Sequence, residues 1–262
     1  MTGIRSLALF GLGQIGGSIA LGLRRKTFSL YGFDPDPAAR RAARRSGLFE
    51  RVLGEASGCD ADLLLLACPM TPLLDLLERM RGWKRLPRAL TDVGSVKTPV
   101  VAAMRRLPAG VSWIGGHPLA GTEGRGWAAA SADRFRGATW VLTREHRGDG
   151  IRLQVSRLVK ALGARPATLD AARHDRILAR TSHLPYLVSC ALVASARAEG
   201  LTPTDLGRFS GGGWRDMTRL ARSDPRMALG YVRANAAEVN RALARFLKTL
   251  RASGPRARGR SR

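Results

Sequence analysis

Two hydrophobic periodicities alternate along the first half of the chain. Short apolar runs, which are typical of buried strands, are separated by segments in which apolar residues recur at helical spacing. The predicted strands are residues 5–10, 29–34, 62–68, 89–92, 111–115 and 138–143. The predicted helices are residues 14–26, 36–46, 71–81, 95–107 and 124–132. Because strand and helix alternate, we expect an α/β fold with a doubly wound sheet of parallel strands.

From about residue 150 onward the apolar residues keep helical spacing, and no convincing strand follows. The predicted helices there are residues 151–163, 170–199, 203–209, 213–221, 225–234 and 236–251. Pro185 should kink or interrupt the longest of them, because proline lacks a backbone N–H. A polar, glycine-rich segment predicts a domain boundary near residues 148–151. The expected parts are an α/β domain over 1–149, an all-helical domain over 150–250 and a basic disordered tail over 251–262.

A glycine-rich turn, GLGQIG at 11–16, connects the first predicted strand to an apolar helix. Gly11 permits a tight turn, Gly13 lets the backbone approach a pyrophosphate, and Gly16 lets the helix pack close to the strand. The next strand ends at Asp34, which is placed to bind a ribose diol. The alternative is a glycine turn in another α/β fold. The predicted dinucleotide-binding residues are Gly11, Gly13, Gln14, Ile15, Gly16 and Asp34.

The residues after this turn bear on the choice of cofactor. Asp34 and Asp36 would repel the 2′-phosphate of NADP, so the sequence favours NAD. Arg40 or Arg41, one helical turn later, could fold back onto such a phosphate, which leaves NADP open.

Two further strands are followed by residues that can face a bound cofactor. Cys68 and Pro69 end the run at 62–68, in the loop that passes the nicotinamide ribose in this kind of fold. We interpret Cys68 as a small buried residue rather than a reactive thiol. Ser95 follows the strand at 89–92 and is either the N-cap of the next helix or a hydroxyl that faces the cleft.

His117 is the candidate catalytic base. It stands in the segment GGHPLAG at 115–121, directly after a predicted strand. The glycines would allow close approach of a ligand, and an imidazole can accept a hydroxyl proton near neutral pH. The alternative is a histidine whose ring nitrogens are satisfied by loop backbone.

The helical half contributes imidazole and guanidinium groups. His174 and His183 lie on the long helical stretch, and a run of three glycines precedes Arg215 and Arg219. The two arginines are four residues apart and share a helix face, and arginine binds carboxylates through two hydrogen bonds. The alternative is a surface ion pair with Asp216. The spacing of the histidines does not suit one metal ion on one helix, so we expect no metal site.

The composition indicates a folded chain of one large or two modest domains, since 45% of its 262 residues are apolar. The formal net charge is +24, but arginine is spread along the whole chain and only 6% of the residues are aromatic. We therefore favour solvated basic faces over a nucleic-acid-binding surface. The three scattered cysteines predict neither a disulfide framework nor a metal site. With no membrane-spanning run and no signal peptide, we expect a cytoplasmic protein.

Together these blocks resemble the prephenate/arogenate dehydrogenase family of tyrosine biosynthesis. The matching segments are GLGQIGGS at 11–18, DVGSVK at 92–97, GGHPLAGTE at 115–123, TSHLP at 181–185 and GGGWRDMTR at 211–219. They follow the family's order, and the HPxAG and RDxTR blocks are far more specific than the glycine turn. The resemblance implies a Rossmann-type domain followed by a helical domain that forms a homodimer.

The resemblance also implies an oxidative decarboxylation. A hydride leaves the hydroxyl-bearing carbon of a cyclohexadiene for NAD or NADP, the ring carboxylate leaves as carbon dioxide, and the ring becomes aromatic. His117 would hold the hydroxyl and assist its deprotonation, Ser95 would hydrogen-bond nearby, and Arg219 would pair with a substrate carboxylate. The other residues implied to line the pocket are Thr122, Glu123, His183, Gly212 and Asp216, the last of them from a partner subunit.

One position departs from the family pattern. Many members carry a second histidine three residues after the first, as in SHLPH, whereas this chain has Tyr186. The position lies near the substrate side chain, so the choice between prephenate and arogenate stays open. The chain ends soon after the helical region, so we also expect no C-terminal regulatory domain. Together these features tilt the expectation slightly toward arogenate.

Two other functions fit parts of the sequence. A 3-hydroxyacid or 6-phosphogluconate-type dehydrogenase would share the two-domain plan but would be expected to use a lysine of the helical domain as its base. No lysine lies between Lys160 and Lys248. A protein that senses dinucleotides or binds nucleic acid would use the basic charge, but it leaves the blocks around His117 and Arg219 unexplained.

Overall fold

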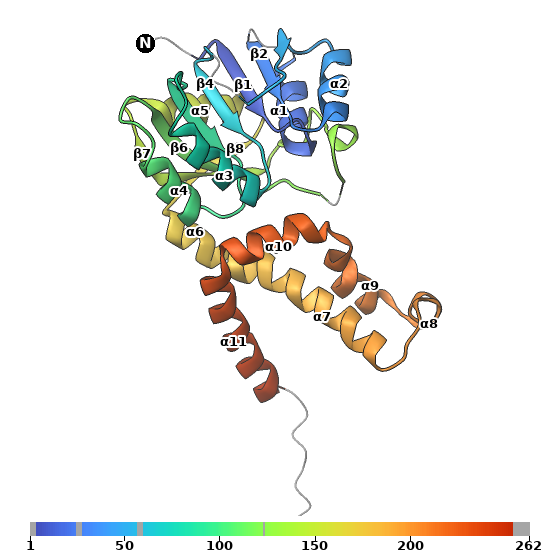
Figure 1. The fold of residues 1–262 in the computed structure, drawn as a ribbon. Coiled ribbons are helices and arrows are strands. Elements are labelled where there is room, and N and C mark those ends of the chain that lie inside the picture. The colour runs from blue at the N-terminus through green and yellow to red at the C-terminus, as the bar shows by residue number, and fades with distance from the viewer. Residues whose placement is uncertain (1–3, 25–27, 57–59, 123, 254–262) are drawn as a thin grey trace, which may run out of the picture. The chain divides into compact units, whose positions relative to one another are not determined.

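The structure is a computed structural model that describes residues 4–24, 28–56, 60–122 and 124–253. It divides into two compact units, of which the first ends at His174 and the second begins at Asp175 (Figure 1). This division lies later than the boundary expected near 148–151. The helix and strand that follow residue 150 pack with the sheet and therefore belong to the first unit.

A sheet of eight strands forms the centre of the first unit in the described part of the chain (Figure 1). The strands are β1 (Ser6–Phe10), β2 (Ser29–Phe33), β3 (Arg51–Val52), β4 (Leu63–Leu66), β5 (Ala89–Asp92), β6 (Ser112–Pro118), β7 (Thr139–Arg147) and β8 (Arg165–Leu169). Their order is β3-β2-β1-β4-β5-β6-β7-β8, and the β6–β7 pair is antiparallel while the other pairs are parallel. The doubly wound α/β class predicted from the sequence is confirmed.

The six strands predicted from hydrophobic runs are all present, and each contributes buried residues to the sheet. In β4, four consecutive leucines are buried, as a central parallel strand requires. The expectation that no strand follows residue 150 is wrong at β8. This strand lies at the edge of the sheet, where partly exposed residues and Pro166 are tolerated, so it lacks the apolar run of a central strand.

Helices cover the sheet of the first unit (Figure 1). They are α1 (Gln14–Leu23), α2 (Pro37–Arg45), α3 (Met70–Met80), α4 (Thr98–Arg105) and α5 (Ile151–Ala161). The core contains fully buried side chains of β1, α1 and β7, among them Leu9, Ile19 and Trp140. The helix predicted over 124–132 is wrong, since only the short 3₁₀ turn η1 (Trp127–Ala129) forms there. Gly126 has a φ of +64°, which a regular α-helix does not allow.

The second unit is helical throughout its described residues. Its elements are the end of α6 (Ala171–Leu178), the π-helical turn η2 (Ala179–His183), α7 (Leu184–Ala198), α8 (Pro203–Phe209), α9 (Gly212–Thr218), the 3₁₀ turn η3 (Arg219–Arg222), α10 (Pro225–Ala234) and α11 (Ala236–Ser253). The interruption predicted from Pro185 is confirmed, because the regular helix widens into η2 directly before it. Residues 251–253 end α11, and the rest of the predicted tail lies outside the described residues.

The continuous helical stretch Ala171–Ala198 is, by length and composition, apolar enough to cross a membrane, with a mean hydropathy of 1.3 in its best window. The sequence analysis expected no such run. Buried polar side chains, among them His174, Asp175 and Ser189, lie along this stretch. The core helix of a water-soluble protein meets the same criteria of length and composition.

Candidate functional site

The glycine turn between β1 and α1 has the geometry that the sequence predicts. Gly11 has a φ of +100°, and a Cβ at this position would lie 2.3 Å from the carbonyl oxygen of Ala67. A Cβ on Gly16 would lie 1.8 Å from the carbonyl oxygen of Gly11, so α1 packs directly against the turn. Gly13 instead faces open space, with no atom within 4 Å of an added Cβ. The N-terminus of α1, where Gln14 and Ile15 begin the helix, is therefore open to an anionic group.

Asp34 follows β2 and holds the glycine turn. Its Oδ2 accepts a hydrogen bond from the N–H of Leu12 at 2.7 Å, and its Oδ1 accepts one from the N–H of Asp36 at 2.9 Å. Arg40 folds back onto the same loop and donates from Nη1 to the carbonyl oxygens of Asp34 at 2.6 Å and Pro35 at 3.0 Å. The acid and the guanidinium therefore lie together where a ribose would be bound.

Cys68 and Pro69 follow β4 at the same edge of the sheet. The thiol of Cys68 donates to the carbonyl oxygen of Phe10 at 3.3 Å. Burial, with the nearby Asp34 carboxylate, raises the pKa of the Cys68 thiol to about 12. The thiol is protonated at neutral pH, which supports its interpretation as a packing residue. Pro69 is the N-cap of α3.

Ser95 lies in the loop between β5 and α4. The helix begins at Thr98 and its N-cap position is occupied by Lys97, so the interpretation of Ser95 as the N-cap is wrong. Ser95 is half-buried in a loop at the carboxyl end of β5. Ser95 therefore lies at the edge of the sheet where the sequence predicts the catalytic site.

A buried ion pair between Asp92 and Lys97 brackets the Ser95 loop. Both side chains have 0% exposure. Asp92 accepts hydrogen bonds from the N–H of Gly94 at 2.7 Å and from the N–H of Gly116 at 3.0 Å. Lys97 donates from Nζ to the carbonyl oxygen of Gly116 at 2.7 Å. The pair thus fixes the loop of Ser95 against the strand segment that carries His117.

The sequence analysis gave no role to Asp92 or Lys97. The available signal was an acid at the end of a predicted buried strand, residues 89–92, with a lysine five residues later. An unpaired charge is costly at such a buried position, so a partner for the acid was to be expected.

His117 lies inside β6, opposite Val141 of β7, rather than in a loop after the strand. The neighbouring glycines have a role different from the one expected. A Cβ on Gly116 would lie 2.5 Å from the carbonyl oxygen of Asp92, and a Cβ on Gly115 would lie 2.8 Å from Thr143. Gly116 therefore lets β6 approach the backbone of β5, and Gly115 makes room for the side chain of Thr143 on β7. His117 is half-buried, and its Nδ1 lies 2.9 Å from Nε2 of His174.

Thr122 connects the loop after β6 to the glycine turn. Gln14 donates from Nε2 to Thr122 Oγ1 at 2.7 Å and accepts at Oε1 from the Thr122 N–H at 3.2 Å. Arg134, which the sequence analysis did not single out, donates to the same hydroxyl at 3.3 Å. The predicted pocket residue Glu123 lies outside the described residues.

His183 lies at the end of η2 and is 1% exposed within the second unit. Its Nδ1 lies 3.2 Å from Nδ2 of Asn235, which also donates to the carbonyl oxygen of Asp175 at 2.8 Å. The ring of Tyr231 stacks on the imidazole with centroids 4.6 Å apart. Sequence reasoning did not find Asn235 or Tyr231, because they lie far from His183 along the chain.

Tyr186 belongs to the same cluster. It is 5% exposed, and its ring meets Tyr231 edge to face with centroids 6.2 Å apart. Burial, together with a hydrogen bond to Cys190, raises the pKa of the Tyr186 phenol to about 12. A neutral phenol therefore occupies this position at physiological pH.

The remaining predicted residues lie on short helical segments of the second unit. Gly212 and Asp216 are exposed on α9, and Arg219 is exposed at the start of η3. The structure thus brings Ser95, His117 and Thr122 to one edge of the first unit. It places Gly212, Asp216 and Arg219 together in the second.

The chain matches known families along most of its length. The family described as "Prephenate dehydrogenase, nucleotide-binding domain" matches residues 19–167, and "Prephenate dehydrogenase, dimerization domain" matches residues 170–253. The chain is 31% identical over 237 residues to the prephenate dehydrogenase of Lactococcus lactis, a match that covers 88% of this chain and 65% of that protein. It therefore spans less than two thirds of that relative's length.

Two further similarities extend over most of both chains. The chain is 31% identical over 260 residues to the cyclohexadienyl dehydrogenase of Zymomonas mobilis, covering 96% of this chain and 88% of that protein. The crystal structure of prephenate dehydrogenase from Aquifex aeolicus, in complex with hydroxyphenyl propionate and NAD+, matches with a TM-score of 0.86 and 29% identity. That match covers 96% of this chain and 90% of the other.

Proposed function

The chain belongs to the prephenate dehydrogenase family, and on that premise we propose that it oxidatively decarboxylates arogenate, prephenate or both, with NAD+ as the hydride acceptor. The observation that carries the proposal is the buried Asp92–Lys97 pair, which holds the Ser95 loop and the His117 strand together. Both lie at the carboxyl edge of the parallel strands, where folds of this class bind their ligands.

The first unit fits a dinucleotide. The open approach to Gly13 and the N-terminus of α1 suit a pyrophosphate. Each oxygen of Asp34 accepts one backbone N–H, and a carboxylate oxygen has a second lone pair with which to accept a ribose hydroxyl. NAD+ supplies a hydride acceptor when it is bound. The Asp34 carboxylate supports NAD, and the nearby Arg40 makes NADP the alternative to test.

His117 is proposed as the general base. As the hydride departs from the hydroxyl-bearing carbon, the imidazole takes the hydroxyl proton, and the resulting ketone draws electrons from the breaking carbon–carboxylate bond. Ser95 would hydrogen-bond near the same hydroxyl. The ring loses carbon dioxide and becomes aromatic, and its oxygen, left as a phenolate, takes the proton back from His117. The substrate therefore loses a hydride and carbon dioxide in total.

The second unit is proposed to bind the rest of the substrate. Arg219 would pair with a carboxylate through its guanidinium fork. The residues proposed to line the pocket are Thr122, Glu123, His183 and Gly212, with Asp216 contributed by a partner subunit. Tyr186 offers a neutral phenol where many relatives have a histidine, and it cannot supply a positive charge to a keto acid. This supports a modest preference for arogenate, whose side chain carries its own ammonium group.

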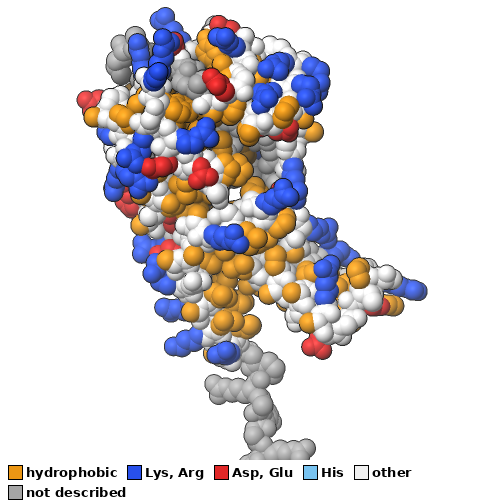
Figure 2. All heavy atoms as spheres, in the orientation of Figure 1, with side chains coloured by type: hydrophobic (Ala, Val, Ile, Leu, Met, Phe, Trp, Pro, Cys, Tyr) orange, Lys and Arg blue, Asp and Glu red, His pale blue; other side chains and the backbone are white. Residues whose placement is uncertain are grey.

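A soluble, cytoplasmic homodimer is the proposed assembly. The match to a dimerization domain over residues 170–253 supports it. Large apolar side chains are exposed on the second unit, including Met217, Met227, Leu247 and Leu250 (Figure 2). Burial of such a surface would stabilise a dimer. Cys68 and Cys190 are free thiols, in keeping with a reducing compartment.

The proposal is tested by measuring NADH formation with four substrates in parallel. These are arogenate, prephenate, 3-hydroxyisobutyrate and 6-phosphogluconate, each with NAD+ and with NADP+. We expect turnover of arogenate, prephenate or both, and a higher kcat/KM with NAD+. Turnover of only the last two substrates, or no turnover with any of the four, would contradict the proposal.

A further inference from the structure

The imidazole of His117 meets a second imidazole, that of His174. Nδ1 of His117 and Nε2 of His174 are 2.9 Å apart, and the rings lie edge to face at 71° with centroids 5.1 Å apart. His174 has 0% exposure. A distance of this size between two ring nitrogens fits one N–H···N hydrogen bond, in which one neutral ring donates and the other accepts.

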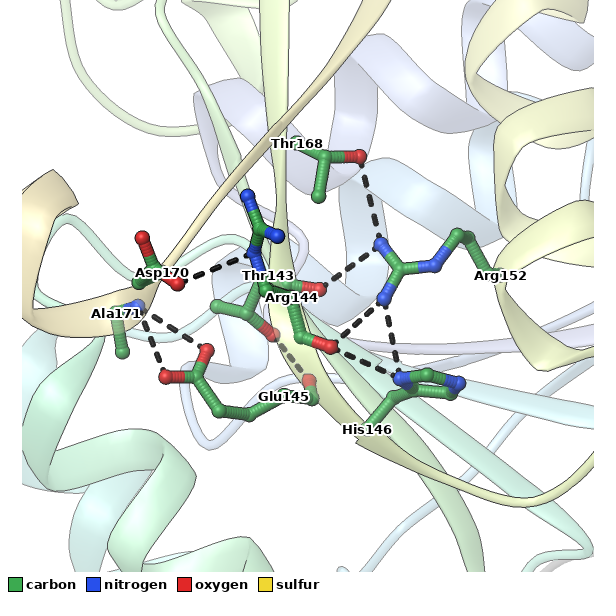
Figure 3. Close-up of polar contacts among 8 residues, drawn as sticks. All are labelled: Thr143, Arg144, Glu145, His146, Arg152, Thr168, Asp170 and Ala171. Atoms are coloured by element: carbon green, nitrogen blue, oxygen red, sulfur yellow. Dashed lines mark hydrogen bonds and ion pairs between the residues drawn. The ribbon is translucent and has the colours of Figure 1, made fainter.

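The start of α6, the helix that carries His174, contacts β7 (Figure 3). Both carboxylate oxygens of Glu145 accept from the N–H of Ala171, at 3.1 and 3.3 Å. Arg144 forms an ion pair with Asp170 at 3.1 Å, and the N–H of His174 donates to the carbonyl oxygen of Asp170 at 2.9 Å. These contacts tie the first turn of α6 to β7.

The same strand also positions His117. β7 pairs with β6 so that Val141 lies opposite His117, and Arg144 and Glu145 follow a few residues later. One strand therefore supports both imidazoles from its two ends. Such support suits a contact whose geometry matters, because the pairing of β6 with β7 holds His117 and the contacts of Arg144 and Glu145 hold the start of α6.

The direction of the hydrogen bond follows from the proposed chemistry. Nδ1 of His117 is turned to His174, so a substrate hydroxyl has to be met by Nε2. A neutral imidazole that accepts a proton at Nε2 carries its hydrogen at Nδ1, and this hydrogen must be donated to His174.

We propose that His174 is a positioning residue: its Nε2 accepts the Nδ1–H of His117 and so holds His117 in the tautomer and ring orientation of a general base. This inference rests on the proposed function. When the substrate hydroxyl gives its proton to Nε2, His117 becomes an imidazolium and keeps its hydrogen bond to His174. The proton taken at Nε2 stays on His117 until the phenolate takes it back, and the role proposed for His174 needs no proton transfer between the two rings.

The kinetic test compares His174→Leu, which removes the acceptor, with His174→Gln, whose amide oxygen can stand near the position of Nε2. His146→Leu is the matched control, since His146 is an exposed histidine of β7. We expect His174→Leu to lower kcat about 10- to 100-fold with KM values nearly unchanged, His174→Gln to restore most of it, and the control to have little effect. An unchanged kcat in His174→Leu, or equal losses in both His174 variants, would overturn the proposal.

A second readout needs no substrate. Nitrogen-15 NMR of histidine-labelled protein distinguishes the two neutral tautomers, and His117→Asn assigns the signal of His117. We expect the Nδ1–H tautomer in the wild type and a mixture of tautomers in His174→Leu. A predominant Nε2–H tautomer in the wild type would contradict the inference. Because this spectrum does not depend on turnover, failure of the positioning role is separable from failure of the proposed enzymatic activity.

Discussion

The two units hold their candidate functional residues in different ways. In the first unit, Asp92 and Lys97 are fully buried and hydrogen-bonded to the backbone around Gly116. In the second unit, Asp216 and Arg219 are exposed on short helical segments. Buried, paired charges fix the geometry before a ligand arrives, whereas exposed side chains can change their contacts when a ligand binds. We infer that the first unit is a preorganised catalytic half of the protein and that the second unit is a substrate-binding half.

The largest expected effect concerns the catalytic half. His117→Asn removes the base while keeping a polar side chain of similar reach. We expect kcat to fall by about 100- to 10,000-fold, because general-base catalysis contributes on that scale. Binding of NAD+, measured by calorimetry on the same variant, should change by less than about threefold because the residues proposed to bind the nucleotide lie elsewhere in the sequence. Activity within about tenfold of the wild type would remove His117 from the role of base.

Breaking the buried pair should strongly destabilise this half, because it leaves one charge buried without its partner. Lys97→Met leaves the carboxylate of Asp92 buried without its cation, and we expect the free energy of unfolding to fall by about 3–5 kcal/mol. Urea denaturation measures this change. The exposed Lys160 on α5 gives the control Lys160→Met, with an expected change below about 0.5 kcal/mol. The double variant Lys97→Met, Asp92→Leu should recover part of the lost free energy of unfolding, because no buried charge is then left unpaired. A loss below about 1 kcal/mol in Lys97→Met alone would contradict the account.

A substitution in the substrate-binding half should change the binding of the substrate rather than the stability of the fold. Arg219→Ala removes the proposed partner of a substrate carboxylate, and we expect KM to rise about 10- to 100-fold with a smaller change in kcat. Thermal unfolding should be nearly unchanged, because the side chain is exposed. Arg226→Ala, at an exposed arginine of α10, is the control. If both variants share the same KM, Arg219 does not bind the substrate.

The smallest expected effect concerns the hydrogen bonds between Asp62 and the backbone at the start of β1 in the first unit. The carboxylate of Asp62 accepts hydrogen bonds from the N–H groups of Arg5 and Ser6, at 2.9 and 3.0 Å. Burial alone raises the pKa of Asp62, but these hydrogen bonds outweigh it and hold the pKa below its usual value. The ionised form is therefore favoured by folding. We expect Asp62→Asn to lower the free energy of unfolding by about 1–2 kcal/mol at neutral pH.

The stabilising effect of the Asp62 carboxylate should depend on pH in one direction. A depressed pKa stabilises the fold above the pKa of the unfolded chain, about 4, and the contribution is lost as the pH falls through the folded-state value. The difference between the wild type and Asp62→Asn should therefore shrink in acid. Asp60→Asn is the control, because Asp60 is 86% exposed and its ion pair with Arg85 spans 3.6 Å. A difference that grows in acid would contradict the account.

Local patterns predicted most of the fold, and they singled out part of the candidate site. The glycine turn, Asp34 and His117 could be found because each belongs to a short segment whose structure is set by its own residues. The edge strand β8 has no apolar run, and Gly126 breaks the helix expected around it, so these elements were misjudged.

Contacts between distant segments were beyond the reach of such patterns. His117 and His174 are 57 residues apart in sequence, and His183 and Asn235 are 52 apart. No periodicity links either pair, because each contact depends on how strands and helices pack. Lys97 was missed for a related reason, since the strand neighbour that completes its hydrogen bonds, Gly116, belongs to β6.

The most direct measurement of the central claim is the stoichiometry of the reaction. With the preferred cyclohexadienyl substrate and NAD+, carbon dioxide and NADH should form in equal molar amounts, and an aromatic product should appear at the same rate. NADH formed without carbon dioxide, or carbon dioxide released without NADH, would contradict the account.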